Sequence, residues 1–104
     1  MRLILSTCKA EEAESIAQTL LEERLVGSVN ILPPCKTVVR FEGEVLTQEE
    51  CVLLMRTRED LVWRLERRYL ELNTYKVPEV ASLEIKEWNG AYERWLMEAT
   101  RTRG

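Results

Sequence analysis

Histidine is absent from this 104-residue sequence. It is the commonest metal ligand in proteins and the commonest general acid or base at neutral pH. There is also no G-x-S-x-G motif and no glycine-rich phosphate-binding loop. Because these absences leave no catalytic constellation, we expect that the protein is not an enzyme, and the residues alone indicate no cofactor.

Cysteine is scarce and dispersed, with three residues and no C-x-x-C pair. This pattern is typical of free thiols rather than of a disulfide framework. We expect Cys8 at the start of a helix, where the helix dipole would lower the pKa of its thiol. We expect Cys35, after two prolines, to be exposed, and Cys51, at the head of an apolar run, to be packed. Cys8 and Cys35 are therefore candidate soft-metal ligands, against the simpler interpretation that all three cysteines are structural.

Long apolar runs and an excess of basic charge are also missing. No run approaches the roughly 20 residues that span a bilayer, and residues 3–5 are too short for a signal peptide. The 15 basic and 18 acidic residues give a net charge of −3, which provides no basic surface for nucleic acid. An RNA-binding sheet would also need stacking aromatic residues, and residues 3–5 and 51–55 contain none. We expect a cytoplasmic protein with neither a membrane nor a nucleic acid as its partner.

The composition that remains, 45% hydrophobic and 32% charged, is that of an ordinary globular protein. The chain contains no linker, internal repeat or low-complexity segment. Its length suits one domain that is large enough to fold without disulfides or metals. We therefore expect a single domain over residues 1–104.

The first third of the chain predicts a strand, a helix and a second strand. Residues 3–5 form a short apolar run typical of a buried strand. A helix is predicted over residues 10–25, capped by Thr7 and ended by Gly27. Its apolar residues recur at steps of three and four: Ala13, Ile16, Ala17, Leu20, Leu21 and Leu25.

A long hairpin follows, with arms at about residues 28–41 and 44–57 and a turn at Glu42-Gly43. Pro33-Pro34 should kink the first arm, because proline cannot donate to a strand ladder. The second arm becomes fully apolar from Cys51, which suggests burial on both faces. Glu49 and Glu50 precede this run; a solvated bend is the simpler interpretation, and a hard-cation site is the alternative.

The last part of the chain predicts a second strand–helix–strand unit and a closing helix. Thr57 and Asp60 resemble a capping box for a helix that must end before Pro78. Its buried face would comprise Leu61, Val62, Leu65, Tyr69 and Leu72. A strand over residues 80–85, a helix after Asn89 and a polar tail over residues 101–104 complete the chain. The inward residues of that helix would be Ala91, Trp95, Leu96 and Ala99.

The predicted order is β-α-β-β-α-β with a C-terminal helix. Right-handed crossovers turn this order into a four-stranded antiparallel sheet with helices on one face, the α+β ferredoxin-like fold. Each hairpin arm would be about 45 Å long, whereas a 100-residue domain has a radius of gyration of about 13 Å. Part of the hairpin should therefore protrude. We expect a homo-oligomer formed through its edges, with interface residues Val38, Val39, Phe41 and, on the last helix, Trp95.

Four segments resemble those of the CutA divalent-cation-tolerance proteins, in the same order and spacing over nearly the whole chain. Residues 23–33 resemble the family's connection from helix to strand, and residues 39–44 its aromatic-Glu-Gly hairpin tip. Residues 75–80, Tyr-Lys-Val-Pro-Glu-Val, resemble its Tyr-x-x-Pro-Glu signature, and residues 89–96 its closing helix. The resemblance implies a ferredoxin-like homotrimer akin to the nitrogen-regulatory PII proteins. It also implies a role in the response to metal ions, with copper as the candidate cation.

The sequence departs from the family at one informative place. Where the family commonly has His-Pro-Tyr, this chain has Asn73-Thr74-Tyr75, so the imidazole ligand is missing. The resemblance implies clefts between subunits near Tyr75, Pro78 and Glu79. Glu79 is a candidate hard-metal ligand there, and the simpler interpretation is a carboxylate that fixes the corner.

Three classes of function are therefore open at this point. The first is a homotrimeric divalent-cation-tolerance protein. The second is a structural or scaffold trimer, or one that senses a small ligand between its subunits, with no metal site of its own. The third is an RNA-binding domain, which the composition disfavours.

Overall fold

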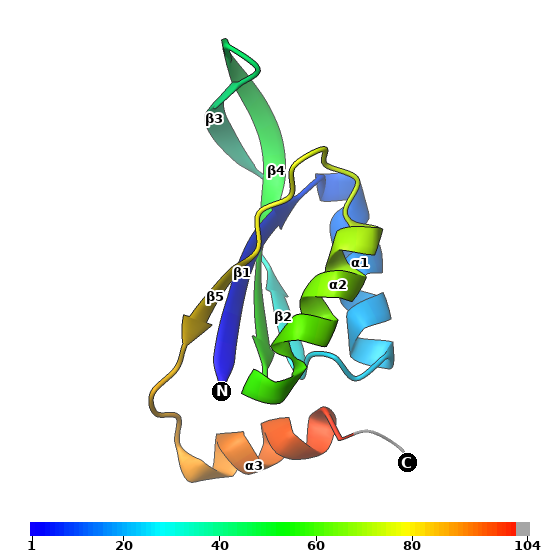
Figure 1. Ribbon diagram of the computed structural model, residues 1–104, viewed down its shortest axis with the longest axis vertical. Coiled ribbons are helices and arrows are strands. Elements are labelled where there is room, and N and C mark those ends of the chain that lie inside the picture. The colour runs from blue at the N-terminus through cyan, green and yellow to red at the C-terminus, as the bar shows by residue number, and fades with distance from the viewer. Residues whose placement is uncertain (102–104) are drawn as a thin grey trace.

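The computed structural model describes residues 1–101, so residues 102–104 of the expected tail lie outside the described part (Figure 1). Short 3-10 turns at Ala10–Glu12 and Glu59–Leu61 precede the first two helices. None of the helices in the described residues is long and apolar enough to cross a membrane. The strands and helices are β1 (Arg2–Cys8), α1 (Ala13–Glu22), β2 (Ser28–Ile31), β3 (Cys35–Phe41), β4 (Glu44–Thr57), α2 (Val62–Leu72), β5 (Ala81–Glu84) and α3 (Gly90–Ala99).

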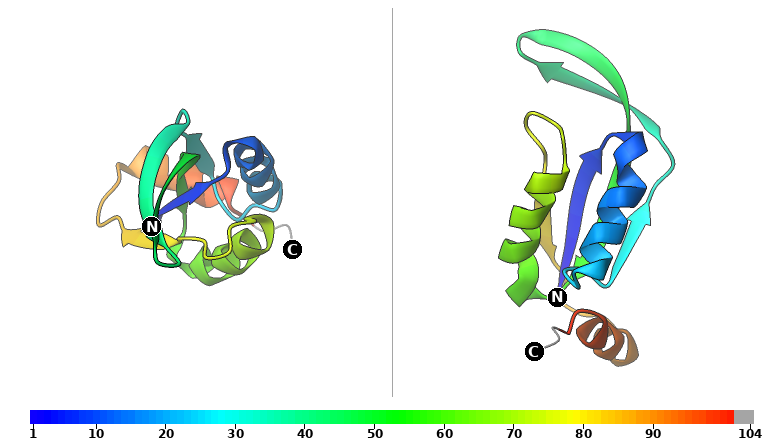
Figure 2. Two further views of the ribbon diagram at one scale, coloured as in Figure 1. Left: turned by 90° about the horizontal axis from the view of Figure 1, so that it is seen from above. Right: turned by 90° about the vertical axis from the view of Figure 1, so that its right-hand side faces the viewer.

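The strands form one antiparallel sheet in the order β2-β4-β1-β5, and β3 pairs with the outer half of β4. Helices α1 and α2 cover one face of this sheet, and α3 lies across the end opposite the hairpin (Figures 1 and 2). This arrangement confirms the predicted α+β ferredoxin-like fold.

The predicted hairpin is present and extends well beyond the helices (Figure 2). Strand β4 has 14 residues; its inner half pairs with β2 and its outer half with β3. Pro33 and Pro34 separate β2 from β3, as expected. Glu42 and Gly43 have φ of 50° and 83°, the left-handed values that a two-residue type I′ turn requires. The hairpin contributes to a molecule that measures 45 × 27 × 22 Å.

The hydrophobic core lies between the sheet and the two helices that cover it. Its largest fully buried side chains include Ile4, Leu53 and Met55 from the sheet and Leu20, Leu65 and Tyr69 from the helices. The predicted inner faces of α1 and α2 are largely confirmed, but Leu21 is 39% exposed, and Val62 and Leu72 are only half-buried against the core. Burial of these apolar groups is the main source of stability in such a fold.

The N-caps predicted at Thr7 and Thr57 are wrong, whereas Asn89 is the N-cap residue of α3 as predicted. Thr7 lies within β1, and the chain enters α1 through a 3-10 turn that follows Lys9. Thr57 is the last residue of β4; its buried hydroxyl donates to the carbonyl oxygen of Leu25 at 2.7 Å. β1 runs further than expected and includes Thr7, whereas β4 ends at Thr57 as predicted for the hairpin arm. Each threonine is therefore used inside the sheet and not at a helix start.

Gly27 does not terminate α1 as predicted, since that helix ends at Glu22 and Arg24 takes the left-handed conformation with φ 58°. Gly27 is instead required by close packing. A Cβ atom at this position would lie 2.3 Å from Leu96 Cδ1 of α3. Of the four inward residues predicted for α3, Leu96 is fully buried, whereas Trp95 is 47% exposed.

Candidate functional site

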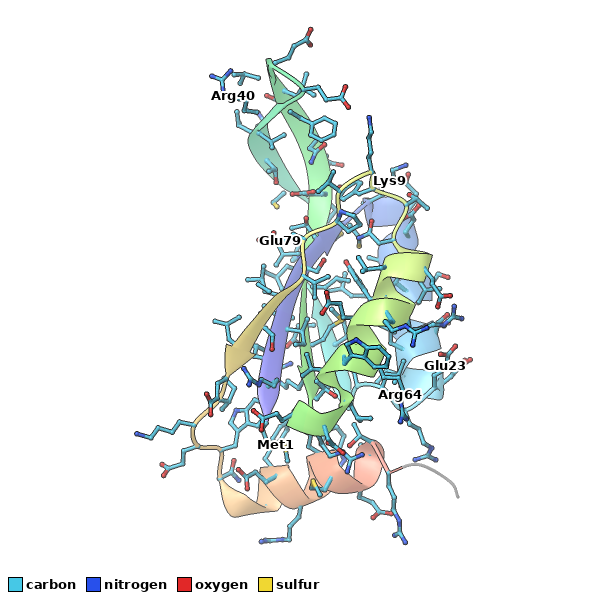
Figure 3. All side chains as sticks on the ribbon, in the orientation of Figure 1. Met1, Lys9, Glu23, Arg40, Arg64 and Glu79 are labelled. Carbon is cyan, nitrogen blue, oxygen red and sulfur yellow. The ribbon has the colours of Figure 1, made fainter. Side chains whose placement is uncertain are left out.

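A cavity of about 290 Å³ lies between the hairpin and the segment that joins α2 to β5. The hairpin lines it with Val39, Phe41, Leu46 and Glu50, among others, and the joining segment contributes Tyr75 and Glu79. Figure 3 shows Glu79 on this segment near the foot of the hairpin and Arg40 close to its tip. Two segments that are distant in the sequence, the hairpin and the segment between α2 and β5, therefore meet at one site.

The joining segment is held by Asn73, which is only 6% exposed. Its side-chain amide nitrogen donates to the carbonyl oxygen of Thr7 at 3.0 Å and to the hydroxyl of Tyr69 at 2.9 Å. Its amide oxygen accepts from the backbone N–H of Tyr75 at 2.8 Å. Asn73 thus ties the start of this segment to β1 and α2, and its hydrogen-bonding groups are used for architecture.

Ser6 fixes the other end of the segment. Its buried hydroxyl donates to the backbone carbonyl oxygen of Glu79 at 2.5 Å and also hydrogen-bonds the hydroxyl of Tyr69. The pKa of Tyr69 is raised, mainly because its phenol is buried. The neutral phenol is therefore maintained as a hydrogen-bonding group between β1 and the joining segment.

Glu50 is the most unusual residue of the cavity because its carboxylate is almost completely buried, with 3% exposure. The hydroxyl of Tyr75 donates to Glu50 Oε1 at 2.8 Å, and the side-chain amide of Gln48 donates to the same oxygen at 3.2 Å. Burial raises the pKa of Tyr75, and its hydrogen bond to Glu50 raises it further. Tyr75 therefore remains protonated and serves as a donor at physiological pH.

An ion pair connects the same segment to the hairpin tip. Lys76 Nζ lies 2.6 Å from Glu42 Oε1, and both side chains are mostly exposed. A surface pair of this kind contributes about 0–1 kcal/mol. Its consequence for the cavity is that the ammonium of Lys76 is directed to Glu42 and not to Glu50.

The residues predicted to line an inter-subunit cleft are only partly together. Tyr75 and Glu79 line the cavity, whereas Pro78 is half-buried beside it. Glu79 was expected to fix the corner through its carboxylate, but its contribution comes from its backbone carbonyl, and its side chain is exposed. Whether a second subunit completes this cleft stays a prediction.

The four predicted interface residues occupy two distant regions. Val38 is 64% exposed and Phe41 is 36% exposed on the hairpin, where the half-buried Val39 lines the cavity. Trp95 lies on α3, at the opposite end of the molecule. One chain therefore presents these side chains on separate surfaces, and their role in an oligomer stays a prediction.

The expectation that Cys8 begins a helix and has a lowered pKa is wrong. Cys8 is the last residue of β1, is fully buried and pairs with Cys51 across the β1–β4 ladder. Burial, followed by proximity to Cys51 and to acidic side chains, raises the pKa of Cys8 to about 11. A thiol with a raised pKa is a poor nucleophile and gives up its proton to a metal less readily.

The other two cysteines lie where they were expected. Cys35 is exposed at the start of β3, and Cys51 is buried. In the β3–β4 register, Cys35 is directly opposite Glu50. Within residues 1–101, no group of three or more His, Cys, Asp or Glu side chains could hold a metal ion.

The sequence predicts a solvated bend at Glu49 and Glu50, with a hard-cation site as the alternative, and so misses the burial of Glu50. The available signal was strand periodicity: in an extended strand, residues two apart share a face, so Leu46, Gln48 and Glu50 lie on one side of β4. Nothing in the sequence indicated that Tyr75, 25 residues further on, would cover that carboxylate.

The antiparallel sheet, with two helices on one face and a projecting hairpin beside a small cavity, defines an α+β protein of the ferredoxin-like class. Comparison with known proteins narrows this class. The family model described as "CutA1 divalent ion tolerance protein" matches residues 2–99. The chain belongs to this family.

Individual relatives support the assignment. The divalent-cation tolerance protein CutA of Thermus thermophilus is 40% identical over 99 residues, which cover 94% of this chain and 96% of that protein. The solved PII-like protein CutA from Nostoc superposes with a TM-score of 0.91 at 29% identity, over 97% of this chain and 98% of that one. The periplasmic divalent cation tolerance protein CutA from Archaeoglobus fulgidus gives a TM-score of 0.91 at 27% identity, over 97% and 100% of the two chains.

Proposed function

We propose that this protein is a homotrimeric divalent-cation-tolerance protein that takes part in the response to metal ions, with copper as the cation to test first. The observation that carries this proposal is the family match along residues 2–99. The divalent-cation tolerance protein CutA of Thermus thermophilus is similar to this chain over 96% of its own length.

The exposed apolar residues of the hairpin support self-association. Besides Val38 and Phe41, the return strand exposes Val45 by 62% and Leu46 by 39%. In addition, β2 and β3 pair only with β4, so each has an edge with no partner strand in the described chain. Unpaired edges next to apolar side chains favour pairing with another copy.

Among the candidate metal ligands, we rank Cys35 first. It is the exposed thiol of the three, and the β3–β4 register sets Glu50 opposite it. Thiolate ligands suit Cu(I), which accepts few donors. A threefold assembly would supply three copies of Cys35, whereas one chain supplies a single exposed thiol. Glu79, exposed at the cavity, is the hard-donor candidate for a divalent cation.

We propose that the protein is cytoplasmic. We also propose that it catalyses no reaction and binds neither nucleic acid nor membranes. The sequence has no histidine and a net charge of −3, and the cytoplasm keeps exposed thiols such as Cys35 reduced. The relative from Archaeoglobus fulgidus is described as periplasmic, so the cytoplasmic location of this protein has to be tested. Fractionation of the producing cell with a specific antibody would decide it.

The metal proposal predicts stoichiometric binding of Cu(I) by the reduced protein. We expect sub-micromolar affinity in a competition titration with a Cu(I) chelator, and its loss in Cys35→Ser. Cys51→Ala is the matched control, because it removes a buried thiol; folding of both variants is checked by circular dichroism. Parallel titrations with Cu(II) and Zn(II) test the divalent form.

Absence of stoichiometric metal binding in all three titrations would contradict the metal proposal. The second candidate function would then stand, a structural trimer or one that senses a small ligand without an intrinsic metal site. The cavity of about 290 Å³ favours this candidate, because the buried charged residue Glu50 lines it.

A further inference from the structure

We infer that the cavity beside Glu50 binds a small organic cation, an ammonium or guanidinium group carried on an apolar or aromatic body. The inference rests on the second candidate function and names its ligand class, and it does not depend on metal binding. It starts from the burial of Glu50, whose side chain is among the least exposed charged groups of the described chain.

Glu50 lacks a cationic partner in residues 1–101. The two groups that donate to it, the hydroxyl of Tyr75 and the amide of Gln48, are both neutral. Among the described residues, the cavity lining has one positive residue, Lys76, whose ammonium is paired with Glu42 at 2.6 Å. A buried charge is costly unless it is paired. The carboxylate of Glu50 therefore requires a positively charged partner, which the described chain does not supply.

The geometry leaves one carboxylate oxygen for this purpose. Both hydrogen bonds within residues 1–101 end on Glu50 Oε1. A carboxylate has acceptor sites on both oxygens, and Glu50 lines the cavity. Oε2 can therefore accept from an N–H donor in the cavity while Tyr75 and Gln48 hold the carboxylate in place.

Part of the remaining lining is apolar and suits an uncharged, apolar body. Val39, Phe41 and Leu46 come from the hairpin and Val77 from the joining segment. Phe41 adds an aromatic ring, against which an aliphatic or aromatic group packs well. The volume of about 290 Å³ is at the lower end of the range of about 300–1,000 Å³ for small-molecule sites, which points to a compact ligand.

The same residues disfavour the other ligand classes. An anionic ligand, such as a nucleotide phosphate, would meet the carboxylates of Glu50 and Glu79, with Lys76 already paired. A chelated metal would require more ligands than the described residues bring together, since no group of three or more His, Cys, Asp or Glu occurs in them. A monovalent organic cation needs only one carboxylate, which Glu50 supplies.

Isothermal titration with three probes of similar shape tests this inference: 2-phenylethylamine, 2-phenylethanol and 3-phenylpropionate. They differ in the group that would face Glu50, which is cationic, neutral and anionic in turn. We expect the amine to bind at least about tenfold more tightly than the alcohol, and the carboxylate not to bind measurably. An alcohol that binds as well as the amine would overturn the inference.

Glu50→Gln removes the charge with little change of shape and should abolish the preference for the amine. Glu49→Gln is the matched control, because it removes the same charge from the exposed neighbour on the same strand; it should retain the preference. Equal amine binding by Glu50→Gln and the wild type would overturn the inference. If Glu50→Gln does not fold, the comparison of the three probes on the wild type still decides.

A lysine or arginine of a second copy could fill the cavity instead. In that case no probe would bind the wild-type oligomer, and Glu50→Gln would weaken its assembly in light scattering; this pair of results would also overturn the inference. Failure of the copper titration together with a clear amine preference would contradict the metal proposal alone. The two experiments therefore separate the two ideas.

Discussion

The thiols of Cys8 and Cys35 differ in chemistry because they differ in burial. Cys8 is fully buried against Cys51, whereas Cys35 is exposed on the hairpin. The helix start that would have activated Cys8 lies further along the chain. Position in the fold, more than residue type, therefore decides which thiol is available to a metal.

The raised pKa of Cys8 predicts a loss of stability at alkaline pH. Its pKa is about 11 in the folded protein against an ordinary value of 9.0 for a cysteine thiol, so between these values the folded state binds more protons than the unfolded state. The free energy of unfolding should therefore fall as pH rises from about 9 to 11, by roughly 2–3 kcal/mol from this residue.

Urea unfolding at pH 8 and pH 10.5, under reducing conditions, measures this loss. Cys8→Ala should be less stable at pH 8 because of its smaller side chain, but it should lose less stability between the two pH values than the wild type. Cys35→Ala, at the exposed thiol, is the control and should follow the wild type. An identical pH dependence in Cys8→Ala and the wild type would contradict the assignment.

Tyr75 provides a second test at the scale of single residues. Tyr75→Phe removes the donor to Glu50 Oε1 and leaves the buried carboxylate with the amide of Gln48. Hydrogen bonds to charged groups contribute about 1.5–3 kcal/mol, so the free energy of unfolding should decrease by about that amount. Tyr92→Phe is the matched control, because the hydroxyl of Tyr92 has only a long contact of 3.3 Å with Ser28. Equal stabilities of the two variants would show that the Glu50 hydrogen bond is unimportant.

At the scale of elements, the contact between Gly27 and α3 positions the C-terminal helix. Gly27→Ala would place a Cβ atom 2.3 Å from Leu96 Cδ1, a fully buried side chain. Overpacking of this kind costs about 1–3 kcal/mol, and we expect α3 to shift or detach.

Thermal unfolding and the fluorescence of the tryptophans near α3 would report this change. Gly90→Ala is the control, because its Cβ would meet only the flexible end of Arg94 at 3.2 Å. A melting temperature of Gly27→Ala equal to that of Gly90→Ala would show that the close packing at Leu96 is not required.

The elements themselves were largely predictable from the sequence. The period-two pattern, the prolines at 33–34 and the Glu42-Gly43 turn located the hairpin, because each reflects a local backbone rule. The helix caps predicted at Thr7 and Thr57 are wrong, because strand pairing includes both residues in β1 and β4 despite their good capping chemistry.

The candidate site was less predictable than the fold, because it depends on contacts between distant residues. Tyr75 and Glu79 were identified by resemblance, and both line the cavity. Glu50 and Asn73 each have one decisive partner far away in the sequence, Tyr75 for the former and Thr7 for the latter. A single sequence carries no signal for such pairings.

At the scale of the whole molecule, the described chain leaves its hairpin without a covering layer. Helices α1 and α2 cover the sheet but not the outer halves of β3 and β4 (Figure 2). Val38 and Val45 are each more than 60% exposed there. We expect these side chains to become buried against other copies of the chain, as in the proposed homotrimer.

The molar mass in solution tests that expectation most directly. Size-exclusion chromatography with multi-angle light scattering at low micromolar concentration should give about 37 kDa, three times the chain mass of 12.2 kDa. A sharp species of 12.2 kDa under these conditions would contradict the homotrimer and the role proposed for the hairpin.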